Sequence, residues 1–305
     1  MDTAQVDEAL QVLDSGLSHI KWRLKSSARR RLHTDILALC TRMRPVIMVD
    51  YGGKMPELQE RLCALLIVLQ KASSTFQHLK VMVIEEMIYL VHVRGFAEHI
   101  NSSLNAATKL LFVDLEQDPP KMVSQEEKSP LLMQLVSIYK SFSSVFPVNE
   151  VDSLISPSFR GEHEVTADVS GYDLITSASS EYVDLSSCIQ ESQVTVPTLN
   201  GWLLGYPVVY LFGKEHIADA IYNLSTKALH LFQITVSRNA TSSKGSLQEE
   251  LLSFSVPYEL SIRGSKEPWA EAFLAHMQTK WNGCNQVWRA LKLEVSECYP
   301  QAIVL

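Results

Sequence analysis

The stretch GWLLGYPVVYLFG, residues 201–213, constrains the fold of this 305-residue chain more than any other feature. It is too short to cross a bilayer, which takes about 20 apolar residues in a helix, and Gly205 and Pro207 interrupt it. Valine and aromatic residues favour extended backbone, and an unbroken apolar run is typical of a strand buried on both faces. The stretch therefore predicts a central, two-face-buried strand at residues 206–212.

Apolar runs elsewhere alternate with amphipathic segments. Strands that alternate with helices predict an α/β protein with a mixed, mostly buried sheet flanked by helices. Residues 79–93 fit either a strand or a buried helix, and the two alternatives stay open. The other expected strands lie at residues 46–49, 109–116, 229–236 and 252–256. The expected helices lie within residues 3–43 (with a break near Ser26), 56–69, 131–146, 217–224 and 268–282.

Residues 150–193 differ from the rest of the chain in composition. They carry nine acidic residues, ten serines and a single base, Arg160, in a chain of net charge −7. Such a segment buries too little apolar surface to offset the entropy lost on ordering. We therefore expect a disordered acidic insert at 150–193 within a single α/β domain, of which residues 1–149 form the N-terminal part and residues 194–305 the C-terminal part.

Positive charge gathers at residues 21–31, KWRLKSSARRR, with six bases and no acid. Such a cluster is usually a solvated helix face or turn, and a nuclear-localisation signal is the alternative. The short length of the cluster, the acidic chain around it and the shortage of interleaved aromatic residues argue against nucleic-acid binding.

The N-terminal residues and the cysteines predict an intracellular location. The first residues, MDTAQVDEALQVLDSG, lack the basic start and the apolar core of a secretory signal. The five cysteines lie far apart and form no CxxC pair, so neither a disulfide framework nor a zinc site is indicated. We expect a soluble protein of the cytoplasm, the nucleus or both, with no membrane segment.

A candidate ligand site lies where the strand at 46–49 ends. Asp50, Gly52 and Gly53 follow this strand and precede a helix, and α/β folds bind ligands beyond strand ends in this way. Rossmann-type methyltransferases hold adenosyl cofactors in a similar arrangement. Asp114 ends another expected strand and lines the same cleft if the two strands are neighbours. The alternative, favoured for so short a motif, is that the glycines only make the turn and Asp50 caps the next helix.

Two stretches, GWLLGYPVVYLF at 201–212 and VDYGG at 49–53, resemble an uncharacterised vertebrate family that is catalogued as a domain of unknown function. The first stretch is the specific part of the resemblance, which covers most of the chain. The resemblance implies an intracellular protein with no established activity, cofactor or catalytic residue, so it assigns no role to any residue.

Two functions remain as hypotheses. The first is a non-catalytic role in protein interaction through residues 150–193, where Tyr172 and Tyr182 are candidate phosphorylation sites. The second is a nucleotide- or adenosyl-cofactor-binding enzyme, methyltransferase-like, that uses the cleft beside Asp50–Gly53. No metal site is expected. His163 lies beside Glu164, and His216 shares a helix face with Asp219, but two ligands fall short of the three or four that a metal site needs.

Overall fold

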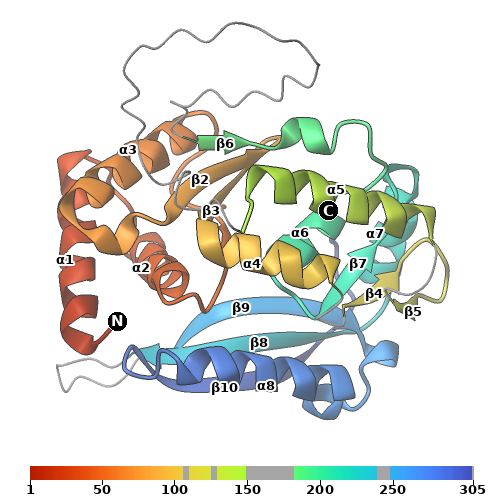
Figure 1. Ribbon diagram of the computed structural model, residues 1–305. Coiled ribbons are helices and arrows are strands. Elements are labelled where there is room, and N and C mark those ends of the chain that lie inside the picture. The colour runs from red at the N-terminus through yellow and green to blue at the C-terminus, as the bar shows by residue number, and fades with distance from the viewer. Residues whose placement is uncertain (106–109, 125–128, 149–181, 239–247, 304–305) are drawn as a thin grey trace, which may run out of the picture.

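The computed structural model describes residues 1–105, 110–124, 129–148, 182–238 and 248–303 (Figure 1). These residues form an α/β protein in which three small sheets are flanked by helices, so the predicted fold class is confirmed. Two of the sheets are mixed and the third is antiparallel. In the described part of the chain, no helix is both long and apolar enough to span a membrane.

The first sheet has the strand order β1-β3-β2-β6. Its centre is a hairpin of β2 and β3, so residues 79–93 are two strands, neither one strand nor a helix. The adjacent charges of Glu85 and Glu86 explain the turn, because neither side chain can be buried within a continuous strand, and both are exposed. The strands are β1 (Val46–Met48), β2 (Leu79–Ile84), β3 (Met87–His92) and β6 (Tyr182–Asp184).

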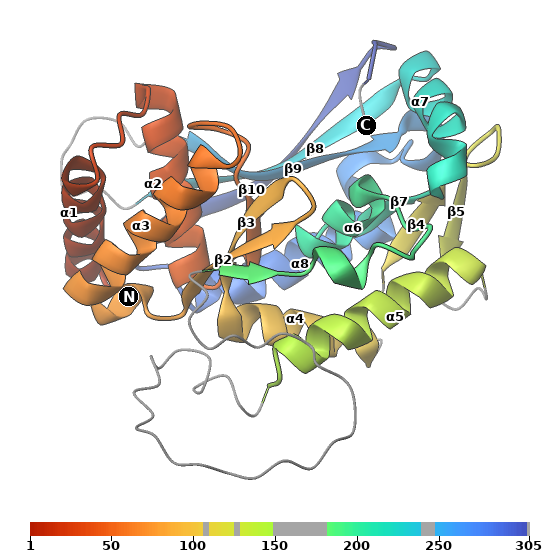
Figure 2. The same cartoon turned by 90° about the horizontal axis from the view of Figure 1, so that it is seen from above.

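Three helices form a layer against this sheet, seen together on the left in Figures 1 and 2. α2 and α3 contact the strands, and α1 packs on both helices. The expected break near Ser26 is a linker at residues 20–25, and Ser26 is the first residue of α2. The leucine stripe of α3 is buried as predicted. The helices are α1 (Thr3–His19), α2 (Ser26–Cys40), α3 (Glu57–Ala72) and the short 3-10 helix η1 (Ser74–Phe76).

The second sheet, β5-β4-β7, contains part of the apolar run at residues 201–213 as its strand β7. This strand is buried as predicted, but it is not central, because β4 is the one strand of the described ranges that pairs with β7. Helix α6 covers one side, where Gly201 lets Val209 approach closely, and Tyr210 bonds across to the third sheet. The elements are β4 (Leu111–Asp114), β5 (Lys121–Ser124), β7 (Val208–Leu211), α4 (Val93–Leu104), α5 (Pro130–Val145), α6 (Val196–Leu203), η4 (Lys214–His216) and α7 (Ile217–Thr226).

The third sheet consists of three long antiparallel strands in the order β10-β8-β9. The aromatic stripe of α8 packs on it, with the Trp269 ring 4.8 Å from the Phe232 ring and the Phe273 ring 5.8 Å from the Phe254 ring. The elements are β8 (Leu229–Arg238), β9 (Gln248–Pro257), β10 (Trp288–Cys298), α8 (Pro268–Asn282), η5 (Tyr258–Leu260) and η6 (Gly264–Lys266).

The predicted acidic insert, 150–193, is wrong at its C-terminal end. Residues 182–193 belong to the folded part, while 149–181, including Tyr172, lie outside the described residues. β6 pairs with β2, and Leu185 and Ile189 are each 1% exposed. The composition of residues 150–193 as a whole is dominated by serines and acids, and two apolar residues near its end change that composition little. The predicted end of the insert therefore lies too far toward the C-terminus. A short 3-10 helix, η3 (Ser186–Cys188), lies between them.

Candidate functional site

The loop after β1, residues 49–53, contacts two separate groups of side chains. Val49 still belongs to the first sheet, since its N–H donates to the Ile88 carbonyl at 2.9 Å. Asp50 is exposed and does not cap α3, whose first turn has no side-chain cap. Tyr51 reaches into a buried ion cluster, and Gly52 packs against the linker between α1 and α2. The loop therefore joins a buried cluster to a surface cavity.

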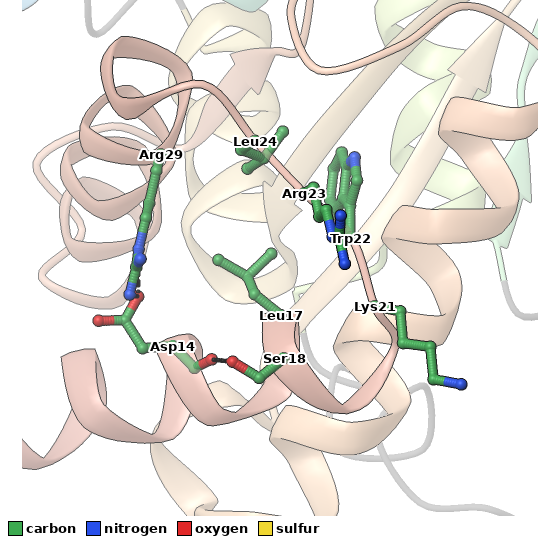
Figure 3. Close-up of a pocket in the computed structure, with 8 residues that line it drawn as sticks. All are labelled: Asp14, Leu17, Ser18, Lys21, Trp22, Arg23, Leu24 and Arg29. Atoms are coloured by element: carbon green, nitrogen blue, oxygen red, sulfur yellow. Dashed lines mark hydrogen bonds and ion pairs between the residues drawn. The ribbon is translucent and has the colours of Figure 1, made fainter.

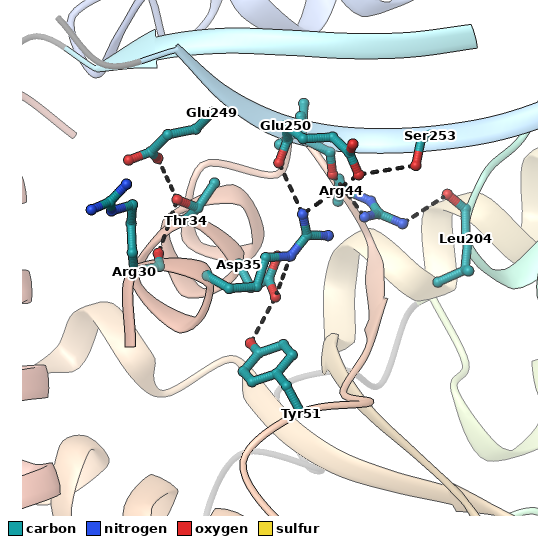
Figure 4. Close-up of polar contacts among 11 residues, drawn as sticks. Arg30, Thr34, Asp35, Arg44, Tyr51, Leu204, Glu249, Glu250 and Ser253 are labelled. Carbon is teal, nitrogen blue, oxygen red and sulfur yellow. Dashed lines mark hydrogen bonds and ion pairs between the residues drawn. The ribbon is translucent and has the colours of Figure 1, made fainter. Parts of the chain in front are cut away.

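The buried cluster, which we call the polar seam, lies between α2, this loop and β9 (Figure 4). Asp35 is 1% exposed, and its Oδ2 accepts hydrogen bonds from Tyr51 Oη at 2.7 Å and Arg31 Nε at 3.2 Å. Arg31 Nη1 also donates to the main-chain oxygen of Glu250 at 3.1 Å. The seam consists of Arg31, Asp35, Arg44, Tyr51 and Glu250.

Burial sets the protonation of the seam. It raises the pKa of Asp35, although the charge of Arg31 opposes the shift. Burial, reinforced by the Asp35 carboxylate, raises the pKa of Tyr51 as well, so the tyrosine stays protonated and donates. Asp35 and Tyr51 are residue types that serve in acid–base catalysis, yet the carboxylate has almost no contact with solvent. The arrangement therefore holds segments together rather than meeting a substrate.

Arg44 closes the seam through main-chain partners. Its guanidinium is buried and donates to the carbonyl of Leu251 at 2.9 Å and of Leu204 at 3.3 Å. Leu251 is the extra residue of a β-bulge in β9, because its two neighbours pair with consecutive residues of β8. The bulge leaves the Leu251 carbonyl free to accept from Arg44. Arg44 thus ties the start of β1 to the third sheet and to the end of α6.

On its other side, the loop backbone at Gly52 lies close to the side chains of Trp22 and Leu24. Gly52 has a φ of +86°, and a Cβ there would lie 2.8 Å from Leu24 Cδ2 and 2.9 Å from Trp22 Cζ2. The indole N–H of Trp22 donates to the Gly52 carbonyl at 3.0 Å. The turn and this packing both require glycine, which accounts for Gly52 without a cofactor. Gly53 is exposed, and a Cβ there would make only ordinary contacts, the nearest at 3.5 Å from Leu58.

Trp22 forms one wall of a cavity of about 410 Å³ between α1, the linker and α2 (Figure 3). We call it the α1–α2 cavity. In the linker, Trp22 and Leu24 point inward while the intervening Arg23 is exposed, as alternation along an extended segment requires. Its walls include Leu17, Lys21, Trp22, Arg23, Leu24 and Arg29.

One acid, Asp14, faces these bases and is already engaged. Its Oδ1 lies 2.7 Å from Arg29 Nη2 and 2.8 Å from His33 Nε2. Burial lowers the pKa of His33, although its hydrogen bond to Asp14 opposes the shift. Lys21 and Arg23 are exposed and form no ion pair with any residue of the described ranges. The cavity therefore presents two uncompensated positive charges.

The end of α1 fixes the position of Lys21. The N–H of Trp22 donates to the Leu17 carbonyl at 3.0 Å, and the N–H of Lys21 to the Ser18 carbonyl at 3.2 Å. This is the Schellman motif, in which glycine normally occupies the left-handed position. Here Lys21 occupies it, with a φ of 55°. A strained residue of this kind is frequently found at functional sites.

The structure does not bring Asp114 to this site. β1 belongs to the first sheet and β4 to the second, so Asp50 and Asp114 do not end adjacent strands. Asp114 instead stabilises its own turn, accepting hydrogen bonds from the N–H of Glu116 at 2.9 Å and from Gln117 Nε2 at 3.2 Å. Asp50 and Asp114 could share one cleft only if their strands were neighbours, and these strands are not. Cofactor binding by Asp50, Gly52 and Gly53 stays a prediction.

The carboxyl ends of the parallel strands β4 and β7 gather other polar groups. Glu116 Oε1 accepts from the N–H of Gly213 at 2.8 Å, and His216 Nδ1 lies 2.9 Å from Asp219 Oδ2. Within the described ranges, no group of three histidine, cysteine or acidic side chains is placed to hold a metal ion. This edge therefore shows local hydrogen bonding but no built site.

The bases at 21–31 and the loop at 49–53 are each evident in the sequence, but their contact is not predicted from it. Trp22 and Leu24 were likewise not predicted to line a cavity. A signal was present: an apolar and a basic side chain alternate at residues 21–24, whereas a solvated helix face carries its bases without buried aromatic neighbours.

Comparison with known proteins identifies a family but no activity. No curated protein and no solved structure gives a significant match to this chain. The family model described as a domain of unknown function, DUF4504, matches residues 14–305, which include the α1–α2 cavity, the polar seam and all three sheets. The chain therefore belongs to the DUF4504 family.

Proposed function

We propose that this protein is a non-catalytic interaction module that binds an acidic segment of a partner protein in the α1–α2 cavity. The observation that carries the proposal is the juxtaposition of two uncompensated bases, Lys21 and Arg23, with an apolar wall formed by Leu17 and Trp22. A segment in which an apolar side chain alternates with carboxylates complements both.

Charge supports an acidic partner. The chain as a whole has a net charge of −7 and therefore repels anions. The local excess of positive charge at the cavity is an exception to this. Complementary charges on such a patch raise the association rate and select among partners more than they raise affinity. A long polyanion such as nucleic acid meets too few bases here, because its affinity grows with the number of phosphates neutralised.

The fixed shape of the cavity supports a binding role as well. Trp22 is held by its bond to Gly52, and Arg29 is held by Asp14. Binding to a preformed wall avoids part of the entropy lost when side chains are immobilised. Partner binding through residues 150–193 is a separate prediction, and the tyrosine at 182 is now seen to be half-buried in β6.

Fluorescence anisotropy tests the proposal with the full chain and a labelled peptide that alternates glutamate with leucine. We expect binding that weakens as salt is added, because exposed charges are screened over about 10 Å at 0.1 M. The double variant Lys21→Glu/Arg23→Glu is expected to abolish it. Lys140→Glu/Lys214→Glu, two exposed lysines outside the cavity, makes the same change in net charge and should retain binding.

Two outcomes contradict the proposal: no binding of the peptide at low salt, or an equal loss in both double variants. A thermal-shift measurement with S-adenosylmethionine and ATP separates the competing function. A ligand at a hundredfold excess over its dissociation constant stabilises by about 2.7 kcal/mol. A shift of that size, lost in Asp50→Ala and kept in Lys21→Glu/Arg23→Glu, would favour a cofactor-binding enzyme.

A further inference from the structure

The outer edge of β10 is a long row of backbone groups that face away from β8. The strand has 11 residues and pairs with β8 from Trp288 to Cys298, apart from a bulge between Trp288 and Ala290. On its other side no strand among the described residues is bonded to it. Natural proteins cover, shorten or charge such edges, because an open edge can pair with another strand.

We propose that β10 pairs antiparallel with β10 of a second copy of this chain, about a two-fold axis at Leu293, to form a homodimer with a continuous six-stranded sheet. The proposal is independent of the α1–α2 cavity. It rests on the order of charges along the strand.

The charges of β10 are self-complementary in this register. Pairing about Leu293 places Lys292 opposite Glu294 of the second copy, and the symmetry repeats the pair. Both side chains are exposed in the single chain, where Glu294 Oε1 also accepts a hydrogen bond from Gln248 Nε2 at 2.8 Å. Opposite charges that face each other across two strands are stabilising, and like charges are destabilising.

The neighbouring registers lack this match. Residues that face each other in a sheet lie on the same face, so the register changes by moving the axis one residue along the strand. An axis at Lys292 sets that lysine against its own copy, and an axis at Glu294 does the same for the glutamate. Only the axis at Leu293 avoids both contacts while opposing unlike charges.

The apolar residues and the neighbouring helix allow the same pairing. About this axis Leu291 faces Val295 of the second copy, and Leu293 faces itself; all three are half-buried in one chain. The α8 rings at Trp269 and Phe273 lie on β8 and β9, and α8 bonds to β10 at the first residue of the strand, where Trp281 Nε1 donates to the Trp288 carbonyl at 2.7 Å. Charges of either sign on an edge strand are enough to prevent aggregation. The alternation of positive and negative charges along β10 therefore favours pairing with a second copy.

A charge-swap series analysed by sedimentation velocity tests the proposal on the full chain. The wild type is expected to show a concentration-dependent dimer. Lys292→Glu sets glutamate against glutamate twice, and Glu294→Lys sets lysine against lysine twice, so each should raise the dimer dissociation constant at least about tenfold. An equimolar mixture of the two variants restores unlike pairs and should form heterodimers.

A chain that stays monomeric at every accessible concentration overturns the proposal, and so does a dimer that neither single variant weakens. Both substitutions lie at exposed positions, and the mixture shows directly that each variant is folded. Leu293→Cys supplies a second readout. Facing residues in an antiparallel pair have Cα atoms about 4.5–5.5 Å apart, within disulfide range, so this variant should form an interchain disulfide beyond the wild-type background. Ser296→Cys, which faces Ala290, should not.

Discussion

The polar seam and the cluster around Trp202 hold secondary-structure elements together by opposite means. The Trp202 cluster joins helices α4, α5 and α6 to one another. Trp202 is fully buried, its ring centroid lies 3.9 Å from that of Tyr139 and 6.1 Å from that of Phe96, and its N–H donates to Ser103 Oγ at 2.8 Å. The seam instead joins α2 to β9 through charged groups, of which Asp35 and Arg44 are buried and Arg31 and Glu250 half-buried. Apolar contacts gain free energy from area removed from water, whereas buried charges first lose their hydration. The comparison implies that the aromatic cluster supplies stability and that the seam selects one relative position of α2 and β9.

Truncating the aromatic cluster should have the largest effect. Trp202→Ala is expected to lower the free energy of unfolding by about 3–5 kcal/mol, because a cavity replaces a fully packed ring. Urea denaturation measures the change. Trp269→Ala is the control, since that ring is only partly buried against the third sheet, and it should lose less. A loss below about 1 kcal/mol at Trp202 would mean that the cluster relaxes around the gap.

Breaking the seam at one partner should come next. Asp35→Ala is expected to lower the free energy of unfolding by about 3 kcal/mol, because Arg31 and Tyr51 lose a buried acceptor. Asp35→Leu combined with Arg31→Met removes both charges and should recover most of that loss. A double-mutant cycle in urea gives the coupling between the two positions. If the double variant is as unstable as the single one, the seam contributes net stability and the proposed contrast fails.

The same contrast explains what the sequence could predict. The leucine stripe of α3 and the stripe of α8 are local patterns of spacing, and both were located correctly. The seam joins Arg31 to Glu250, 219 positions apart, and Asp35 to Tyr51, 16 apart. Asp35 lies in a segment rich in bases, which reads locally as a solvated helix face.

The candidate site was predicted in part for a related reason. Strand order is a property of the whole fold, so the sequence does not show whether the strands that end at Asp50 and Asp114 are neighbours. The prediction that Asp114 lies beside Asp50 was wrong. The loop at 49–53 was located, since an apolar run before two glycines is a local signal. The contact of this loop with Trp22 was not predicted. A glycine at residue 52 does not indicate which other segment packs against it.

Acid should distinguish the two interfaces. His99 stacks on Trp202 with ring centroids 5.2 Å apart, and burial lowers its pKa to about 4. Because this pKa lies below the unfolded value of about 6.5, the contribution of His99 is complete above pH 6.5 and is lost as the pH falls towards 4. Asp35 has the opposite sign, since burial raises its pKa and its contribution declines as the pH rises through the folded value.

We therefore expect a loss of about 1–2 kcal/mol from His99 between pH 7 and pH 5. His99→Gln should flatten the curve of unfolding free energy against pH over this range. His19→Gln, at an exposed position, is the control and should leave the slope unchanged. An unaltered slope in His99→Gln would place the acid sensitivity elsewhere.

The smallest effect should be a gain. Lys21 and Arg42 are left-handed residues at the ends of α1 and α2, with φ of 55° and 56°. A side chain in this conformation costs about 1 kcal/mol relative to glycine, so Lys21→Gly and Arg42→Gly should each raise the free energy of unfolding by about that amount. The proposed acidic-peptide binding should weaken in Lys21→Gly alone, because Arg42 lies outside the α1–α2 cavity. Urea denaturation and anisotropy on the same samples measure both quantities. Stabilisation accompanied by lost binding would show that the strain at Lys21 serves the cavity, whereas unchanged binding would leave the strained lysine without a role there.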